Sequence, residues 1–321
     1  MVLGLAACAS TGDQPGPRTS PGVVTITPEP AKTSTYAERE QSRFQAEGAD
    51  GMVAAAGALW AKTDTGHVLR IDPRTNKVTA DLVVDKHTGQ SFYCQGIGAD
   101  GQSVWACSTR SEGTGVVRID PDTARIEQQV RVGKVFDQLA LPSTARGIWV
   151  LTHGGTEISV VDPGSGHVTT YPLGVRCQQV GAGGSRVVAT DVVGGNVVVV
   201  DAGTGTVVDR LTVDTPRMAV VVGGDIWVDS AAGLVRFSDG LKTRTVYAGI
   251  TAGQGGDLFS EGGSVWLRAS DGTIFRIEAT SGKLLERIDP SPKVSAGSLV
   301  VAFGSIWTTG SEEGVIIRLR E

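Results

Sequence analysis

The chain has 321 residues, of which 44 are glycine, 40% are hydrophobic and 20% are charged. This composition excludes a disordered chain and a collagen, and no stretch reaches the roughly 18–20 apolar residues of a membrane-spanning helix. The formal net charge of −5, without a basic block, argues against nucleic acid as a partner.

The first eight residues end in a sequence that resembles a bacterial lipobox. Small residues precede a cysteine in Leu5-Ala6-Ala7-Cys8, and in a lipoprotein that cysteine is acylated and becomes the mature N-terminus. Only seven residues precede Cys8, whereas a complete signal peptide has a basic region and about 7–15 apolar residues. We interpret residues 1–8 as the remnant of a lipoprotein signal peptide, with lipidation at Cys8. The alternative is a chance sequence in an alanine-rich tail.

Residues 9–35 are predicted to be a tether. Five prolines stand among serine, threonine and glycine between Ala9 and Lys32, a composition typical of a solvated, semi-extended linker. An acylated cysteine followed by such a spacer would hold a folded domain away from a bilayer. We therefore expect an exported protein, anchored by lipid alone to the outer face of the cytoplasmic membrane.

The remaining residues, 36–321, repeat one motif seven times. Its pattern is Gly-x-apolar-Trp-apolar, as in Gly147-Ile148-Trp149-Val150, and every tryptophan of the chain occupies the same place in it. Successive copies are 39–45 residues apart. The residues at the tryptophan position are Trp60, Trp105, Trp149, Val188, Trp227, Trp266 and Trp307.

A second apolar segment follows each copy, and several contain an arginine, as in Val116-Val117-Arg118-Ile119-Asp120-Pro121. A turn such as 201–205 comes next, where Asp can cap its own backbone and Gly supplies positive φ. A further segment follows this turn in the copies before the last. In the second copy it is residues 125–132, which alternate between polar and apolar and so indicate a strand at a sheet edge. A four-stranded unit of roughly 40 residues, repeated seven times, predicts an all-β, seven-bladed β-propeller with antiparallel blades.

The seventh unit contains only three predicted strands before Glu321. Its fourth strand must then come from the N-terminal region, either from Tyr36–Ala46 or from Gly22–Thr27. Such a closure would join the two ends of the ring and remove an exposed edge.

The repeat "G-x-I-W-V … V-x-R-I-D-P-x-T-G-x-V" resembles the YVTN and virginiamycin B lyase-like superfamily of seven-bladed β-propellers, over everything after the tether. Together with the lipobox, it suggests a bacterial lipoprotein of the actinobacterial type. The resemblance implies the fold. In the lyases of this superfamily a histidine base, a glutamate and magnesium act on the propeller face. No histidine follows His167 here, so the resemblance assigns no catalytic residue.

Polar residues recur where the inner strands of the predicted blades begin. Ligands of propellers usually meet this end, at the mouth of the central channel, and Arg217 facing acids and amides would suit a polar or anionic small ligand. The alternative is a water-filled mouth whose polar side chains only solvate each other. The candidate binding residues are Asp50, Gln95, Asp137, Gln138, Gln178, Gln179, Arg217 and Asp257.

Three cysteines lie in the predicted propeller. Cys94 and Cys107 flank two antiparallel neighbours of blade two, so a disulfide between them is geometrically reasonable and would leave Cys177 as a single thiol near the mouth. The alternative is three free buried cysteines. The four histidines show no metal-ligand spacing, so we expect neither metal nor cofactor.

Two functions fit these features. We expect a monomeric, non-catalytic scaffold that presents its loops to a protein, a peptide or a small polar ligand at the cell surface. The alternative is a hydrolase or lyase, lactonase-like or virginiamycin B lyase-like, that acts on a small polar substrate at the channel mouth. The sequence identifies no catalytic residue for it.

Overall fold

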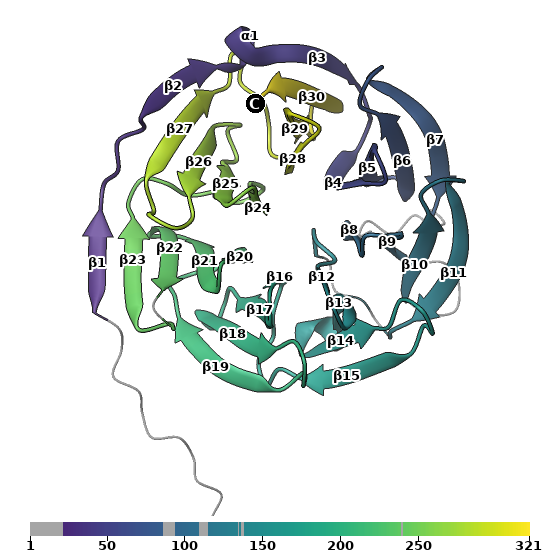
Figure 1. The fold of residues 1–321 in the computed structure, drawn as a ribbon, viewed down its shortest axis with the longest axis horizontal. Helices are drawn as coiled ribbons and strands as arrows, with labels where there is room; N and C mark the ends of the chain where they lie inside the picture. Colours follow the sequence, from purple (N-terminus) through teal and green to yellow (C-terminus); the bar gives the residue numbers. More distant parts are fainter. Residues whose placement is uncertain (1–21, 86–93, 109–114, 134, 136–137, 239) are drawn as a thin grey trace, which may run out of the picture.

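Seven sheets stand around a central axis like the blades of a fan, as Figure 1 shows for a computed structural model of the chain. The structure describes residues 22–85, 94–108, 115–133, 135, 138–238 and 240–321. The predicted seven-bladed β-propeller with four-stranded antiparallel blades is confirmed. In the described part of the chain, no helix has the length and apolar character needed to cross a membrane.

Each blade runs from an inner strand at the axis to an outer strand at the rim. From the axis outward, blade one has β4 (Ala49–Ala55), β5 (Ala58–Thr63), β6 (His67–Asp72) and β7 (Lys77–Val83), and blade two has β8 (Ile97–Ala99), β9 (Val104–Ser108), β10 (Gly115–Asp120) and β11 (Arg125–Arg131). Blade three has β12 (Ser143–Thr144), β13 (Gly147–Thr152), β14 (Glu157–Val161) and β15 (Val168–Pro172). Blade four has β16 (Gln179–Gly183), β17 (Arg186–Asp191), β18 (Asn196–Asp201) and β19 (Val207–Thr212).

The last three blades include strands from both ends of the chain. In the same order, blade five has β20 (Ala219–Val222), β21 (Asp225–Ser230), β22 (Gly233–Ser238) and β23 (Thr243–Tyr247). Blade six has β24 (Asp257–Glu261), β25 (Ser264–Arg268), β26 (Ile274–Glu278) and β27 (Leu284–Asp289). Blade seven has β28 (Leu299–Ala302), β29 (Ser305–Gly310), β30 (Val315–Arg320) and β3 (Glu40–Gln45).

The ring closes in blade seven, where β3 pairs in the antiparallel direction with β30, so that Phe44 lies opposite Ile316. Of the two segments predicted to supply this strand, Tyr36–Ala46 is therefore the right one. The single helical turn α1 (Tyr36–Arg39) directs the chain into β3, and Thr35 and Glu38 form a capping box at its start. Tyr36 is fully buried, and its hydroxyl donates to the Gly272 carbonyl at 2.6 Å.

Two strands form inside the segment that the sequence predicts to be linker. β1 (Val23–Ile26) adds in parallel to β23, and β2 (Lys32–Thr35) adds in parallel to β27, as fifth strands of blades five and six. Pro28 and Pro30 lie in the segment between these two strands, and Figure 1 shows both strands at the outer rim of the ring. The outer strands offer unpaired backbone groups, so short stretches of Val, Ile and Thr pair there although the overall composition is that of a spacer.

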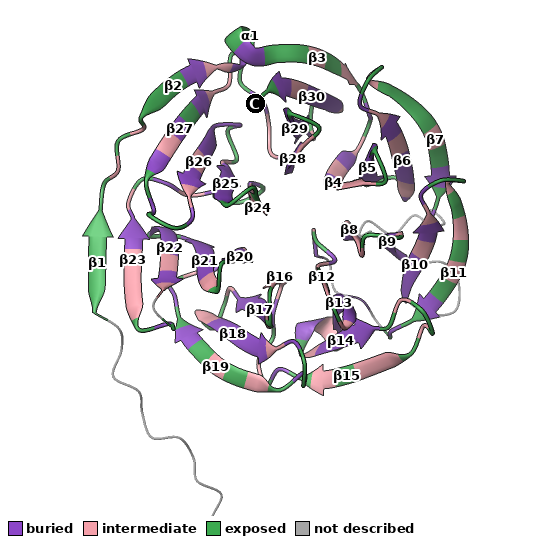
Figure 2. Cartoon of the chain, viewed as in Figure 1, coloured by how far each residue is buried: buried purple, intermediate pink, exposed green. Residues whose placement is uncertain are grey.

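The tryptophans fill the space between blades. All six are at most 1% exposed, and each packs against a neighbouring blade: Trp149, for example, lies in one core cluster with Val187, Ala189 and Val198 of blade four. Figure 2 shows the burial of the strands around the ring, with middle strands largely buried and outer strands such as β7 and β11 partly exposed.

The recurrent arginine of the third strand is explained by its register with the tryptophan. Arg70, Arg236, Arg276 and Arg318 lie directly opposite Trp60, Trp227, Trp266 and Trp307, with each guanidinium 4.9–5.9 Å from the ring centroid. At this distance a guanidinium is attracted by the face of the indole. In blade four the tryptophan position is Val188, and its partner is Val199. Blade three has the tryptophan without the arginine, because Trp149 lies opposite Val160.

Candidate functional site

The inner strands begin at the mouth of the channel. The second strand of each blade ends at the same side, since the first residue of an inner strand pairs with the last residue of the second strand, as Asp257 does with Arg268. The turns between second and third strands, and the connections between blades, lie at this same end. A cavity of about 310 Å³ lies at the axis. Its walls come from the inner strands β4, β8, β24 and β28, residues 139–143 and Ala182.

The inner strands of blades two and three are close enough to hydrogen-bond. The Leu141 amide donates to the Ile97 carbonyl at 3.0 Å, and a Cβ at Gly98 would stand 1.9 Å from the Leu141 carbonyl oxygen. Only glycine permits this approach. The cavity is therefore surrounded by a tightly joined inner ring.

Two predicted binding residues connect neighbouring blades. The Gln179 side-chain oxygen accepts from the Leu139 amide of the preceding blade at 3.0 Å. Asp257 accepts from its neighbour Leu258 at 2.7 Å and, with its other oxygen, from Leu299 of blade seven at 2.8 Å. Burial raises the pKa of the Asp257 carboxyl, because the charged form is costly out of water. Both side chains satisfy backbone groups of the adjacent inner strand.

Two other predicted residues act within their own blades. Gln138 is fully buried: its oxygen accepts from the Leu151 amide and its nitrogen donates to the Ala140 carbonyl, both at 2.7 Å. It faces the interior rather than the open mouth. Gln178 is half-buried, and its oxygen accepts from the Val192 amide at 2.8 Å.

The remaining candidates are distributed around the ring. The Gln95 side-chain nitrogen of blade two donates to Asp64 of blade one at 2.7 Å. The backbone carbonyl of Asp50 accepts from the Ser298 hydroxyl, which joins blades one and seven. Asp137 lies outside the described residues.

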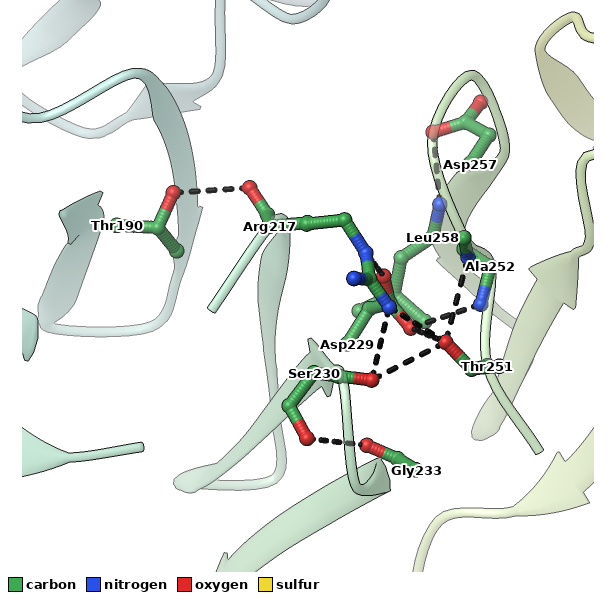
Figure 3. A network of polar contacts seen from close by, with 10 residues as sticks. Thr190, Arg217, Asp229, Ser230, Gly233, Thr251, Ala252, Asp257 and Leu258 are labelled. Carbon is green, nitrogen blue, oxygen red and sulfur yellow. Dashed lines mark hydrogen bonds and ion pairs between the residues drawn. The ribbon is translucent and has the colours of Figure 1, made fainter. Parts of the chain in front are cut away.

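Arg217 is the centre of the network in Figure 3. Its Nε donates to Asp229 at 2.7 Å, and its Nη2 donates to the Ser230 carbonyl at 2.8 Å and to the Thr251 hydroxyl at 2.6 Å. Asp229 is fully buried and also accepts from Thr251 and from the amide of Ala252. The charge of Arg217 is thus neutralised by Asp229, and the guanidinium holds the connection between blades five and six.

Three buried charged residues that the sequence did not predict as site residues occupy the equivalent position in three blades, two residues after the tryptophan. Lys62 forms an ion pair with Asp85 at 2.7 Å, with both side chains fully buried. Asp229 holds Arg217, and Arg268 reaches into blade seven, donating to Thr308 at 2.6 Å. A charge in an otherwise apolar strand was the signal that would have identified them.

Of the two interpretations of the cysteines, the one with a Cys94–Cys107 disulfide and a free thiol at Cys177 is confirmed. A disulfide joins Cys94 and Cys107, whose Cα atoms are 5.8 Å apart. Cys177 is a buried free thiol, and burial raises its pKa to about 12. Among the described residues, no group of three or more His, Cys, Asp or Glu could hold a metal ion.

One loop at the mouth presents an apolar side chain to solvent. Between β17 and β18, Val193 is 91% exposed. Asp191 accepts from the Gly194 amide at 2.7 Å and from the Asn196 side chain at 3.2 Å, and Gln178 holds the Val192 amide. Three side chains thus fix the turn that carries Val193.

No protein-family model matches the sequence, and no curated protein matches it. Solved structures do share the fold. Hydrazine synthase from Kuenenia stuttgartiensis aligns over 88% of this chain and 97% of its own, with a TM-score of 0.64 and 14% identity. The β-propeller domain of Swd1 from Myceliophteria thermophila covers 88% and 99%, with a TM-score of 0.65 and 14% identity. BamB from Moraxella catarrhalis covers 88% and 99%, with a TM-score of 0.56 and 13% identity. Identities this low establish the fold alone, and membership of the YVTN and virginiamycin B lyase-like superfamily stays a prediction.

Proposed function

We propose that this protein is a non-catalytic binding scaffold that takes a protein or peptide partner on the mouth face of its propeller. In this proposal the N-terminal segment directs export, lipidation of Cys8 anchors the chain to the outer face of the cytoplasmic membrane, and a monomer is the working form. The actinobacterial lipoprotein type belongs to the same proposal.

The observation that carries the proposal is the fixed loop around Val193. An apolar side chain that is 91% exposed gains nothing from folding, yet Asp191, Asn196 and Gln178 all hold its turn in one conformation. A partner that buries this valine gains apolar contact without having to order the loop first, which is how preorganised interface residues contribute most to affinity. The loop therefore has the properties of a binding anchor.

The polar residues of the mouth support the same assignment. Gln179 and Asp257 accept hydrogen bonds from the backbone of the neighbouring blade, and Arg217 is neutralised by Asp229. Their hydrogen bonds make the mouth a rigid frame. Arg217, which the sequence predicted to face a polar or anionic ligand, has Asp229 as its counter-ion instead.

The test is capture of partners from a membrane extract with the intact chain as bait. We expect Val193→Asp to lose the captured partner, since burial of a valine is worth about 1.5–3 kcal/mol, or tenfold and more in affinity. The matched control is Val208→Asp, which changes a valine that is 51% exposed on the outer strand β19. Equal capture by both variants would refute the assignment, and so would turnover of a small molecule by the purified chain alone.

A further inference from the structure

The axial cavity combines apolar walls with one carboxyl group. Its volume of about 310 Å³ is at the lower end of the range of small-molecule pockets, roughly 300–1,000 Å³. Most of its lining residues are apolar or glycine, among them Met52, Leu139, Leu258 and Phe259. Among the described residues that line it, Asp257 is the one with an ionisable side chain. The cavity is independent of the loop around Val193.

The carboxyl of Asp257 keeps hydrogen-bonding capacity. Each of its oxygens accepts one backbone N–H, from Leu258 and from Leu299, whereas a carboxylate oxygen can accept two. No lysine, arginine or histidine of the described residues lies within 4 Å of it. Figure 3 shows Asp257 at the start of its strand, beside Leu258 and apart from the ion pair of Arg217.

The nearest cationic group on the same blade already has other partners. Arg268 lies opposite Asp257 in the ladder, but its guanidinium donates to the Thr308 hydroxyl at 2.6 Å and to the Thr309 carbonyl at 2.9 Å, both in blade seven. It also donates to the Ser295 carbonyl at 2.5 Å. Arg268 therefore lowers the cost of the buried carboxylate from a distance, without occupying its free acceptor positions.

We propose that the axial cavity binds a small apolar amine, with the ammonium group on Asp257 and the hydrocarbon against Met52, Leu258 and Phe259. The Asp257 carboxylate is half-buried and lacks a contacting cation among the described residues, so it gains from a ligand that brings one, because charge-assisted hydrogen bonds are stronger than neutral ones. The apolar walls select a hydrocarbon body. A carboxylate ligand would meet repulsion from Asp257.

The raised pKa of Asp257 agrees with this geometry. Desolvation disfavours the ionised form of the Asp257 carboxyl, and an ammonium ion against it would favour the charged form. This site differs from the anionic-ligand site expected around Arg217, since that guanidinium already has its carboxylate. The ligand proposed for the axial cavity is therefore a cation, whereas the sequence predicted an anionic or polar ligand around Arg217.

The test uses three probes of one chain length, hexylamine, hexan-1-ol and hexanoate, with the intact chain in thermal unfolding and titration calorimetry. A ligand that binds the folded state raises the Tm in proportion to its affinity. We expect hexylamine to raise the Tm most and hexanoate to leave it unchanged. Asp257→Asn keeps an oxygen for the Leu299 amide but loses the charge, and should weaken hexylamine binding about tenfold or more.

Two further variants make the result decisive. Asp214→Asn changes an exposed acid of the mouth face outside the cavity wall, and should bind hexylamine like the unchanged chain. Ala182→Phe fills the cavity and leaves Asp257 in place, so it should abolish binding even if Asp257→Asn fails to fold. The proposal is overturned if hexylamine gives no heat and no Tm shift, if hexanoate binds as well, or if Ala182→Phe binds hexylamine normally. Because Val193 is not part of the cavity, loss of this site would leave the scaffold proposal standing.

Discussion

Removing the Asp229 carboxylate should destabilise the fold more than most single substitutions. In Asp229→Ala the guanidinium of Arg217, whose side chain is 17% exposed, loses its counter-ion. The amide of Ala252 loses its acceptor inside the core, and one buried unsatisfied donor costs about 1–3 kcal/mol. Breaking a buried ion pair by removing one partner costs about 3–5 kcal/mol in total. We expect a loss of about 3–5 kcal/mol in the free energy of unfolding.

Equilibrium unfolding in urea, followed by tryptophan fluorescence, measures this loss as a lower midpoint at unchanged slope. A thermal scan should show a fall in Tm of about 5–8 °C. The double variant Arg217→Met/Asp229→Ala should recover part of the stability, because it no longer buries an unpaired charge. Arg74→Ala is the control: its side chain is 88% exposed beside Asp72, and such ion pairs contribute at most about 1 kcal/mol.

Two results would refute the reasoning. A loss below about 1 kcal/mol in Asp229→Ala would mean that the charge of Arg217 is solvated and that the network contributes little. A double variant as unstable as the sum of the two single variants would mean that the residues act independently. In either case the mouth would not be the rigid frame on which the proposed function depends.

Two further predictions concern buried titratable groups. Burial raises the pKa of Tyr36 to about 12 from 10.0, so its stabilising contribution is complete below pH 10 and is lost as the pH rises towards 12. Between pH 10 and 12 the urea midpoint should therefore fall less steeply with pH in Tyr36→Phe than in the unchanged chain. The same dependence on pH in both chains would contradict this prediction. Burial raises the pKa of the Cys177 thiol to about 12, so in a Cys8→Ser chain no thiol should react with Ellman's reagent until denaturant is added, when one should react. A fast-reacting thiol in the native chain would show that Cys177 is accessible.

The ring was predictable because its information is repeated. The tryptophan position recurs every 39–45 residues, with Val188 in one copy, and the strand pattern that recurs with it identifies the blade and its buried positions. The closing strand was narrowed to two segments, of which Tyr36–Ala46 contains β3. The two outer strands β1 and β2 were missed, because each has only four residues and depends on the edge of a strand far away in sequence.

The mouth was predictable only in part. Counting from the tryptophans placed the starts of two inner strands at Gln178 and Gly256, one residue before the observed starts at Gln179 and Asp257. It could not identify the backbone amides of Leu139 and Leu299 that these two side chains hold, since those amides belong to other blades. Arg217 was expected to face a ligand because nothing local identifies its counter-ion. Asp229 stands 12 residues later on the paired strand, and only the register brings the two together.

The pairing of β3 with β30 also determines when the fold can be completed. The closing strand β3 comes before the strands of blade one in the sequence, and its partner β30 comes after the strands of all other blades. During synthesis, the four antiparallel strands of each of blades one to six emerge in order, but β3 has no sheet to join until β30 emerges. Loop closure over nearly the whole chain is slow, so the final step of folding should be the docking of blade seven. Loss of β30 would then affect more than one strand, since Tyr36 of α1 packs in the same core cluster as Ile317 and Leu319 of β30.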